Sequence, residues 1–358
     1  MEKRIKQSFA CRHITSYNIN TLLAEFRTPK MGDVGIFRVV APKGNALVDV
    51  HGSTYTLFEG DHIMLSFGNR YATNQYEGYV PSEPTVECDL LARGGVAGLV
   101  HSVNPTFRST PAKLELVGYA TDHDGVVLNT IDKDLTRFNP NSKRPKVVLS
   151  IGTSMDSGKT TTAAYLCGGL KKAGHKVAFI KLTGTAYPKD AQLNVDRGAD
   201  YGTDFSALGY PSTYMVSHSE LLNLYQSLVE KVVSEVNPEY IVMEIADGLL
   251  QRETNMLLKD RAFMSTIHNV IFSSGDSLSV LTGLQMLHDW GCAPFAVAGL
   301  FTSSELLIRE VQPFIDTPIL RLNEVFEGKA VEILRGVEEG MSVGMEMSYS
   351  NNRVALRA

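Results

Sequence analysis

The sequence lacks the features that mark membrane proteins, exported proteins and nucleic-acid-binding proteins. No apolar run approaches the roughly 20 residues that a membrane span needs, and the first residues include no apolar stretch typical of a signal peptide. The formal net charge is −5, and no basic stripe stands out against it. We therefore expect a cytoplasmic protein that binds neither a membrane nor nucleic acid.

Cysteine is scarce, and its spacing matches no metal site or redox motif. The four cysteines are scattered along the chain at Cys11, Cys88, Cys167 and Cys292. Isolated thiols of this kind are usually reduced and buried. We expect them to contribute to packing rather than to chemistry.

The composition indicates a globular protein with more than one domain. The chain has 358 residues, of which 44% are hydrophobic and 20% are charged, and this length suggests about two or three domains. The clearest interruption is the segment NPNSKRP at 139–145, because its prolines and polar residues continue neither a strand nor a helix. The sequence predicts a mainly-β domain over 1–138, a linker over 139–145 and an α/β domain over 146–358.

Short segments rich in β-branched and aromatic residues dominate the N-terminal part. They lie at 34–40, 46–50, 54–58, 62–67 and 114–120, with turn residues between them, which predicts a small antiparallel barrel or sandwich. Residues 68–79 and the glycine-rich 92–98 read as loops. The first contains Arg70 and three tyrosines, which could hold a substrate; a structural loop or domain contact is the alternative.

A phosphate-binding loop follows the linker. The run 147–151 suits a buried parallel strand, and a helix-compatible segment extends from Lys159 to about Gly174. Between them the backbone N–H groups and the start of the helix would cradle phosphates, with Lys159 on the β- and γ-phosphates and the Thr160 hydroxyl on Mg²⁺. The predicted nucleotide-binding residues are Gly152, Thr153, Ser154, Met155, Asp156, Ser157, Gly158, Lys159, Thr160 and Thr161.

After the loop, strands and helices alternate, which predicts a parallel sheet with helices on both faces. We expect further strands at 177–182, 240–243, 269–272, 295–300 and 317–322, and a helix at 219–236 with one apolar stripe. Residues 189–205 read as a long loop that carries four aspartates.

Carboxylates near the strand ends are candidates for the metal site. Magnesium that is bound with a nucleotide usually takes one or two carboxylates, phosphate oxygens and water. In the 189–205 loop we favour Asp196 and then Asp204. After the strand 240–243, Glu244 is the first choice and Asp247 the second.

The same edge of the sheet should hold substrate contacts, because ligands of open α/β sheets gather at the carboxyl ends of strands. Lys181 is a catalytic candidate there, unless it is solvated at the rim. Thr183, Gly184 and Arg252 are candidates for contact with substrate, together with Asp204, Asp247 and Arg70.

These residues resemble dethiobiotin synthetase and its relatives in the SIMIBI class of P-loop proteins. The loop 152–160 is similar to their G-T-x-x-x-x-G-K-T, including one residue more than the G-x-x-x-x-G-K-[ST] pattern has between its glycines. Lys181 with Thr183 and Gly184 resembles the end of their second strand. The resemblance covers roughly 147–322 and implies that Glu244 binds Mg²⁺, with Asp196 as the other metal aspartate.

Three positions depart from that family. Ile245 and Asp247 replace the glycines of its E-G-A-G-G element, and Ser154 stands where its loop has an aspartate. Because these positions border the reacting groups, dethiobiotin synthesis itself is not expected.

The leading hypothesis is an ATP- and Mg²⁺-dependent enzyme, a kinase or ligase, that phosphorylates or activates a small molecule. The loop backbone and Lys159 would hold the phosphates, and Lys181 would steady the transferred group or the acceptor. Thr160, Asp196 and Glu244 would hold the metal. The alternative is a nucleotide-dependent switch or cofactor-delivery protein that acts on a partner. We expect a dimer. The acceptor, and ATP as against GTP, stay open, because no base-recognition motif such as N-K-x-D is present.

Overall fold

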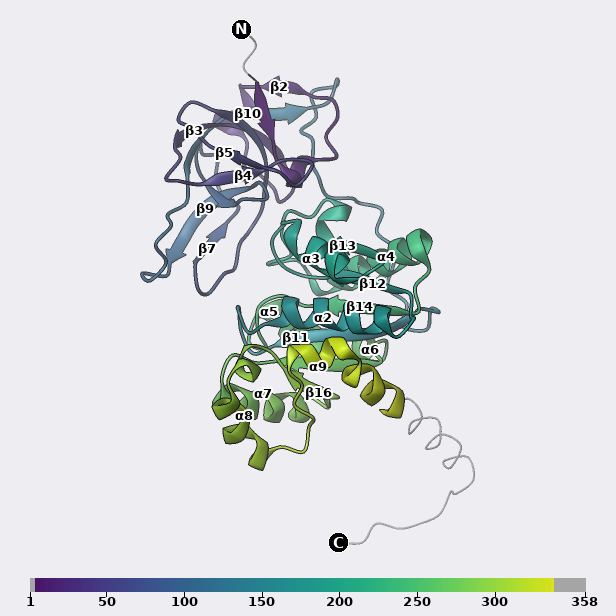
Figure 1. Ribbon diagram of the computed structural model, residues 1–358. Coiled ribbons are helices and arrows are strands. Elements are labelled where there is room, and N and C mark those ends of the chain that lie inside the picture. The colour runs from purple at the N-terminus through teal and green to yellow at the C-terminus, as the bar shows by residue number, and fades with distance from the viewer. Residues whose placement is uncertain (1–3, 338–358) are drawn as a thin grey trace.

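The computed structural model describes residues 4–337 and contains a mainly-β region followed by an α/β region. In Figure 1 the β region lies at one end of the molecule, above the α/β region. Residues 133–145 between them form no helix or strand, and they run along helix α4 (His218–Val236). Two backbone N–H groups hold this segment to α4, Thr136 N at 2.8 Å from Ser227 Oγ and Phe138 N at 2.9 Å from Asn223 Oδ1.

The β region is built on a closed barrel. Its strands follow the order β6 (His62–Phe67), β3 (Val34–Ala41), β10 (Lys113–Thr121), β8 (Glu87–Ala92) and β9 (Val96–Val103). β9 pairs with β6 again through Ser66↔Val96 and Phe67↔Ala97, which closes the ring. Closure leaves no free sheet edge in the barrel itself.

Shorter elements decorate this barrel. Strand β1 (Ile5–Gln7) pairs with β6, β2 (Asn18–Asn20) with β10, and β7 (Tyr76–Tyr79) with β9. A separate hairpin joins β4 (Ala46–Val48) to β5 (Thr54–Thr56), and α1 (Leu23–Phe26) and the 3₁₀ turn η1 (Phe9–Cys11) complete the region. Alternate residues on facing strands fill the barrel interior, among them Phe37, Val39, Ile63, Leu65, Phe67, Leu90, Leu114, Leu116 and Tyr119.

The α/β region contains a six-stranded sheet that is parallel throughout. The order is β13 (Tyr201–Asp204), β12 (Val177–Lys181), β14 (Tyr240–Glu244), β11 (Lys146–Gly152), β15 (Asn269–Ser273) and β16 (Ala296–Ala298). The apolar run of β11 is continuous because both faces of the sheet are covered. A short final strand expected at 317–322 is reduced to a single bridge, Val297↔Ile319.

Helices cover the two faces in separate layers. Val148 and Phe179 face helices α2 (Lys159–Lys172), α3 (Lys189–Arg197) and α9 (Leu322–Glu327). Leu149 and Ile180 face α4, α5 (Arg252–Lys259), α6 (Arg261–Met264) and α7 (Ser277–Asp289). The region also contains three 3₁₀ turns, η2 (Phe205–Leu208), η3 (Leu300–Ser303) and η4 (Gln312–Phe314), and helix α8 (Glu305–Val311). Residues 329–337 are helical as well. The predicted fold class, a P-loop parallel sheet with helices on both faces and a smaller mainly-β part before it, is confirmed.

Several local predictions need correction. Residues 189–205 form helix α3 and strand β13 rather than a long loop, because Pro188 and Gly198 bound a segment whose Ala191 and Asn194 pack inward. Residues 92–98 are not one loop: Ala92 ends β8, 93–95 form a tight turn and 96–98 begin β9. Part of 68–79 forms β7, since glycines in these segments do not end the strands. All four cysteines are free and buried, as expected. Within residues 4–337 no helix is both long and apolar enough to cross a membrane.

Candidate functional site

The predicted phosphate loop connects the end of β11 to the start of α2. Gly158, its last residue, has φ +97°, and a Cβ at this position would lie 3.0 Å from Gly299 Cα and Leu300 N. Only glycine fits this left-handed turn without strain. The Leu300 N–H donates to the Ser157 carbonyl at 3.0 Å and braces the loop from the end of β16.

Lys159, the first residue of α2, folds back over the loop. Its Nζ donates to the Ser154 carbonyl at 2.7 Å and lies 3.5 Å from Ser157 Oγ. Burial lowers the pKa of this ammonium, and Glu244 and Asp247 act in the opposite direction. The side chain can therefore exchange a carbonyl partner for a phosphate oxygen without leaving the loop.

Glu244 ends strand β14, directly beside the phosphate strand β11, and Ser150↔Glu244 is the register pair. Its Oε1 accepts a 3.0 Å hydrogen bond from the Thr160 hydroxyl, and its Oε2 is buried with no hydrogen-bond partner. Burial raises the pKa of Glu244, and Lys181 acts to lower it.

This pair fits a nucleotide-bound magnesium ion. An unpartnered buried carboxylate oxygen next to a hydroxyl is a hard-oxygen donor set of the kind Mg²⁺ uses, with phosphate oxygens and water filling the other positions. No cluster of three or more His, Cys, Asp or Glu side chains suited to a metal occurs among residues 4–337, so the site would need the nucleotide to complete it.

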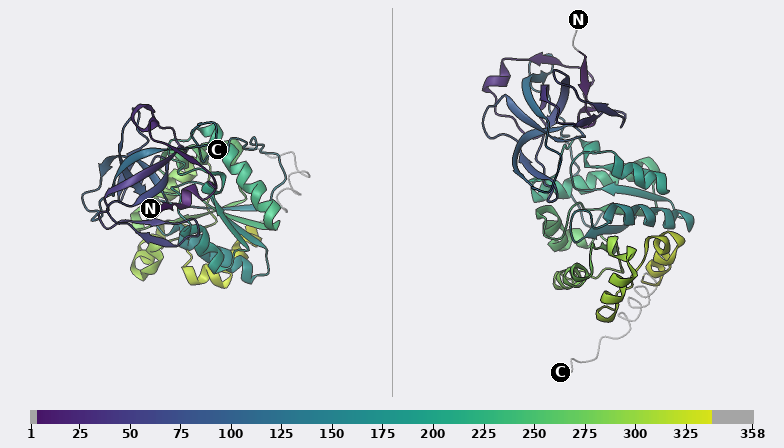
Figure 2. Two further views of the ribbon diagram at one scale, coloured as in Figure 1. Left: turned by 90° about the horizontal axis from the view of Figure 1, so that it is seen from above. Right: turned by 60° about the vertical axis from the view of Figure 1, so that its left-hand side comes forward.

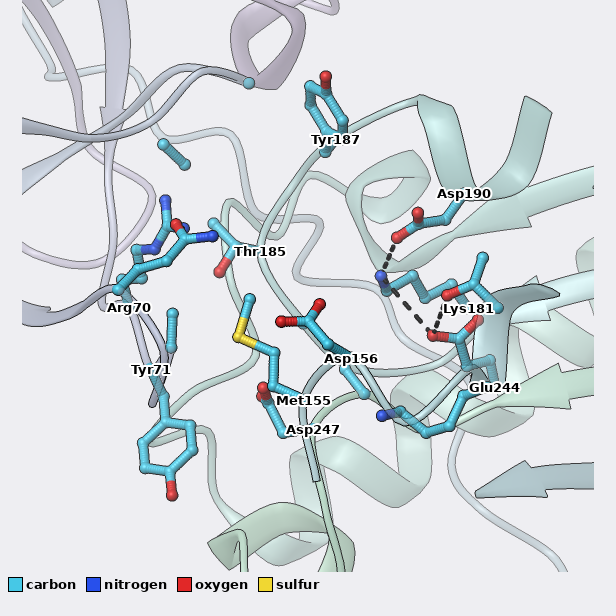
Figure 3. A pocket seen from close by; sticks show the side chains of 18 of the residues that line it. Arg70, Tyr71, Met155, Asp156, Lys181, Thr185, Tyr187, Asp190, Glu244 and Asp247 are labelled. Atoms are coloured by element: carbon cyan, nitrogen blue, oxygen red, sulfur yellow. Dashed lines mark hydrogen bonds and ion pairs between the residues drawn. The ribbon is translucent and has the colours of Figure 1, made fainter. Parts of the chain in front are cut away.

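Lys181 ends strand β12 and bridges two acids. Its Nζ is ion-paired with Asp190 and lies 3.9 Å from Glu244 Oε1 (Figure 3). Burial acts to lower the pKa of Lys181, but Glu244 and Asp190 outweigh it and the pKa is raised. The lysine is therefore a charged, fixed group at the pocket and not a solvated rim residue.

The structure places the predicted acids of residues 189–205 differently from the expectation. Asp196 is exposed on α3 and accepts from Gln192 Nε2 at 2.7 Å, away from the pocket. Asp190, one helical turn and more before it, lines the pocket instead. Because α3 is helical, these two aspartates lie at different positions along and around the helix. An interpretation of 189–205 as a loop provides no basis for choosing between them. Reading Pro188 as the start of a helix would have indicated Asp190.

Three further candidates serve the structure around the site. Asp204 is buried and caps η2, accepting from Ser206 N at 2.8 Å. Thr183 Oγ1 accepts from Ala246 N at 2.8 Å and ties the ends of β12 and β14. Arg252 donates to the Val216 carbonyl at 2.9 Å and pairs with Glu253. None of the three lines the pocket, whereas Gly184 does.

The phosphate loop opens into one large pocket between the two regions, with a volume of about 850 Å³. One wall comes from the α/β region, and the other comes from the β region. From the predicted site it includes Arg70, Met155, Asp156, Gly158, Lys159, Thr160, Thr161, Lys181, Gly184, Glu244 and Asp247. In Figure 3, Arg70 and Tyr71 face Lys181 and Glu244 across the pocket, with Met155, Asp156 and Asp247 between them. The right-hand view of Figure 2 shows the β region lying against the α/β region.

Two acids in the middle of this pocket have left-handed backbones. Asp156 in the phosphate loop has φ +62°, and Asp247 after β14 has φ +61°. Asp156 accepts a 2.9 Å hydrogen bond from Asn74 of the β region. Asp247 makes no hydrogen bond or ion pair with the part of the chain that is described, and burial raises its pKa while Lys159, Lys181 and Arg70 lower it in part. Such strained positions persist where a site requires them.

Comparisons with known proteins find likenesses among solved structures only. No protein-family model and no curated protein matches the sequence. The signal recognition particle receptor FtsY from Elizabethkingia anophelis is 17% identical, with 52% of this chain and 54% of that chain covered and a TM-score of 0.30. A DUF1611 family protein from Anabaena variabilis is 13% identical, with 60% and 65% covered and a TM-score of 0.37.

A nucleotide-binding protein from Archaeoglobus fulgidus, in complex with ADP, is 11% identical, with 51% of this chain and 85% of that chain covered and a TM-score of 0.32. The chain spans about half the length of the FtsY structure. Likenesses this weak assign no function. The chain's own geometry, a phosphate loop between a parallel strand and a helix with an acidic strand end beside it, is that of a nucleotide-binding P-loop protein, as the sequence predicted.

Proposed function

We propose that this protein is an ATP- and Mg²⁺-dependent enzyme that phosphorylates or activates a small-molecule acceptor. The observation that carries the proposal is the shared pocket: the phosphate loop, Lys181 and Glu244 face a wall from a different region of the chain. A volume of about 850 Å³ lies in the upper part of the range for small-ligand pockets, roughly 300–1,000 Å³. It leaves room for an acceptor beside a nucleotide.

Each group has a role in phosphoryl transfer, which depends on positioning and on neutralising charge. Lys159 would hold the terminal phosphates, and Lys181, fixed by Asp190, would steady the transferred group. Thr160 and Glu244 would hold the magnesium ion, which supplies neutralising charge to the phosphates. Asp190, and not Asp196, is the α3 aspartate at the pocket, and its partner is Lys181.

Asp247 is the candidate to accept the acceptor's proton. It lines the pocket without a partner, and its raised pKa makes it a better base than an ordinary aspartate. In this reaction the acceptor's nucleophilic oxygen would form the new bond to the γ-phosphorus while the bond to ADP breaks.

The test is ATP and GTP consumption by the purified protein, with Mg²⁺, before and after addition of pooled small metabolites. Consumption that stays negligible until one pool is added supports the enzyme. Slow consumption that no pool changes, together with nucleotide-dependent self-association, contradicts it and favours a switch.

A further inference from the structure

Arg70, on the β-region wall of the pocket, is a half-buried cation without an acidic partner. Its Nη1 lies 3.3 Å from the Tyr76 hydroxyl and also donates to the Leu91 carbonyl, and its Nη2 donates to Gln75 Oε1. All of these acceptors are neutral. No carboxylate of residues 4–337 forms an ion pair with Arg70, and its Nε is buried with no hydrogen-bond partner.

The guanidinium is held in place by the surrounding structure. Its Cζ lies 4.5 Å from the centroid of the Tyr76 ring, and the Tyr76 hydroxyl is itself fixed by a 2.8 Å hydrogen bond to the Leu91 carbonyl. The backbones of Arg70 and Gly78 exchange two hydrogen bonds, which closes the intervening loop. A fork held this firmly loses little freedom when it binds an anion.

A charge that is partly removed from water and has only neutral partners is stabilised further when an anion binds it. The nearest acids of the pocket belong to the opposite wall: Asp247 influences Arg70 through space without contacting it. Burial lowers the pKa of Arg70, and Tyr76 and Asp247 act in the opposite direction. The residue remains charged, because arginine titrates far above neutral pH.

On the acceptor side of the pocket, no carboxylate of residues 4–337 pairs with the cation Arg70. Lys159 and Lys181 lie on the phosphate side, whereas the β-region wall contributes the half-buried Arg70 and the exposed Arg93. The loop that carries it also contacts the phosphate loop, through Asn74 and Asp156. A molecule held by Arg70 therefore lies within one pocket with the nucleotide phosphates.

We propose that Arg70 binds the carboxylate of the acceptor, so that the substrate is a small carboxylic acid. This inference rests on the proposed function. A planar carboxylate matches the two-pronged guanidinium, and it would displace part of the neutral hydrogen bonding that Gln75 provides. A second possible source of the anion is a nucleotide phosphate, and the experiment separates the two.

The experiment measures the thermal midpoint of the full chain with saturating Mg-ADP. The probes are unbranched mono- and dicarboxylic acids of two to six carbons, with and without an α-amino or α-hydroxyl group, each beside its amide. Arg70→Gln removes the charge. Gln75→Glu keeps Arg70 and gives it a permanent carboxylate partner, so the subsite is filled from within and no cavity is made. Arg261→Gln, an exposed arginine on α6, controls for loss of one positive charge.

We expect at least one acid, and not its amide, to raise the midpoint of the wild type and of Arg261→Gln. For that acid, titration should give a dissociation constant about 10–100-fold higher in both Arg70→Gln and Gln75→Glu. The midpoint shift caused by Mg-ADP alone should be equal in all four proteins. Gln75→Glu should fold at least as well as the wild type, so lost binding there does not reflect unfolding.

The proposal is overturned if no acid raises the midpoint, or if the acid binds Gln75→Glu as well as the wild type. It is also overturned if Arg70→Gln weakens Mg-ADP or Mg-ATP binding instead, because the anion is then a nucleotide phosphate. If Mg-ADP fails to bind even the wild type, the proposed function fails. The acid titrations on nucleotide-free protein then decide the Arg70 subsite by itself.

Discussion

The Thr160 hydroxyl donates a 3.0 Å hydrogen bond to Glu244 Oε1, which joins the first turn of α2 to the end of the neighbouring strand. The bond brings together two ligands expected for magnesium that are far apart in sequence. The other carboxylate oxygen of Glu244 is left buried without a partner.

Glu244→Gln should therefore weaken binding of Mg-ADP by about 10–100-fold and leave binding of metal-free ADP unchanged. The amide keeps the size of the side chain and loses the charge that a cation needs. Calorimetric titration with and without EDTA measures the difference. Asp196→Asn, on the exposed face of α3, should bind like the wild type, and a loss there equal to that of Glu244→Gln would contradict this assignment.

Lys159→Ala should reduce nucleotide turnover by about 10²–10³-fold, because a preorganised charge at the phosphates is removed. The fold should persist, since the partners lost are a carbonyl and a hydroxyl of the same loop. A coupled ADP-release assay gives the rate, and circular dichroism checks the fold. Lys133→Ala, at an exposed lysine, is the matched control. Full turnover by Lys159→Ala would refute the role of the loop.

Asp204→Asn should stabilise the protein at neutral pH. Burial raises the pKa of Asp204, although the hydrogen bond from Ser206 and the charge of Arg12 act to lower it. The folded state therefore favours the neutral carboxyl. Stability from this group therefore falls as the pH rises from about 4 through the raised pKa. Asparagine removes that dependence and keeps an oxygen for the 2.8 Å bond from Ser206 N. In urea unfolding between pH 4 and 8, the free energy of unfolding of the variant should increase relative to that of the wild type as the pH rises. A difference that does not change with pH would contradict this.

Gly94→Ala should disturb the contact between the two regions. A Cβ on Gly94 would lie 1.8 Å from the carbonyl oxygen of Ala186, which belongs to the α/β region. Within the β region, Ala10 N holds Gly94 in place by donating to its carbonyl at 2.8 Å. We expect a destabilisation of about 1–3 kcal/mol and weaker acceptor binding. Gly275→Ala is the control, because a Cβ there meets nothing within 4 Å. Equal thermal midpoints for Gly94→Ala and Gly275→Ala would contradict this prediction, because the contact between the two regions would then accommodate the added methyl group without cost.

The sequence was most informative where a local pattern of residues has a single structural interpretation. A buried strand, a glycine-bounded loop and a helix start predict the phosphate loop, and an acid at the end of an apolar strand predicts Glu244 at the same edge. The prediction was poorest between strands. Asp190 and Asp196 are the same residue type in one segment, so a local pattern does not distinguish them. Only the helical turn of α3 brings the Asp190 carboxylate to the Lys181 ammonium. The pairing of β9 with both β8 and β6 depends on contacts between distant segments, which no local pattern contains.

In the proposed enzyme, the closed barrel and the sheet would divide two tasks, recognition of the acceptor and binding of the phosphates. An enzyme made of one region must perform both tasks with the same elements. Under the proposed function, phosphate chemistry would depend on the sheet and its loop. The fit to the acceptor would depend on the 68–79 segment, which closes through Arg70 and Gly78 without altering the ring. If Arg70 binds the acceptor as proposed, exchange of residues in that segment would change which molecule is accepted while the nucleotide end stays as it is. Selection for a new substrate, in nature or in the laboratory, would be expected to act there first.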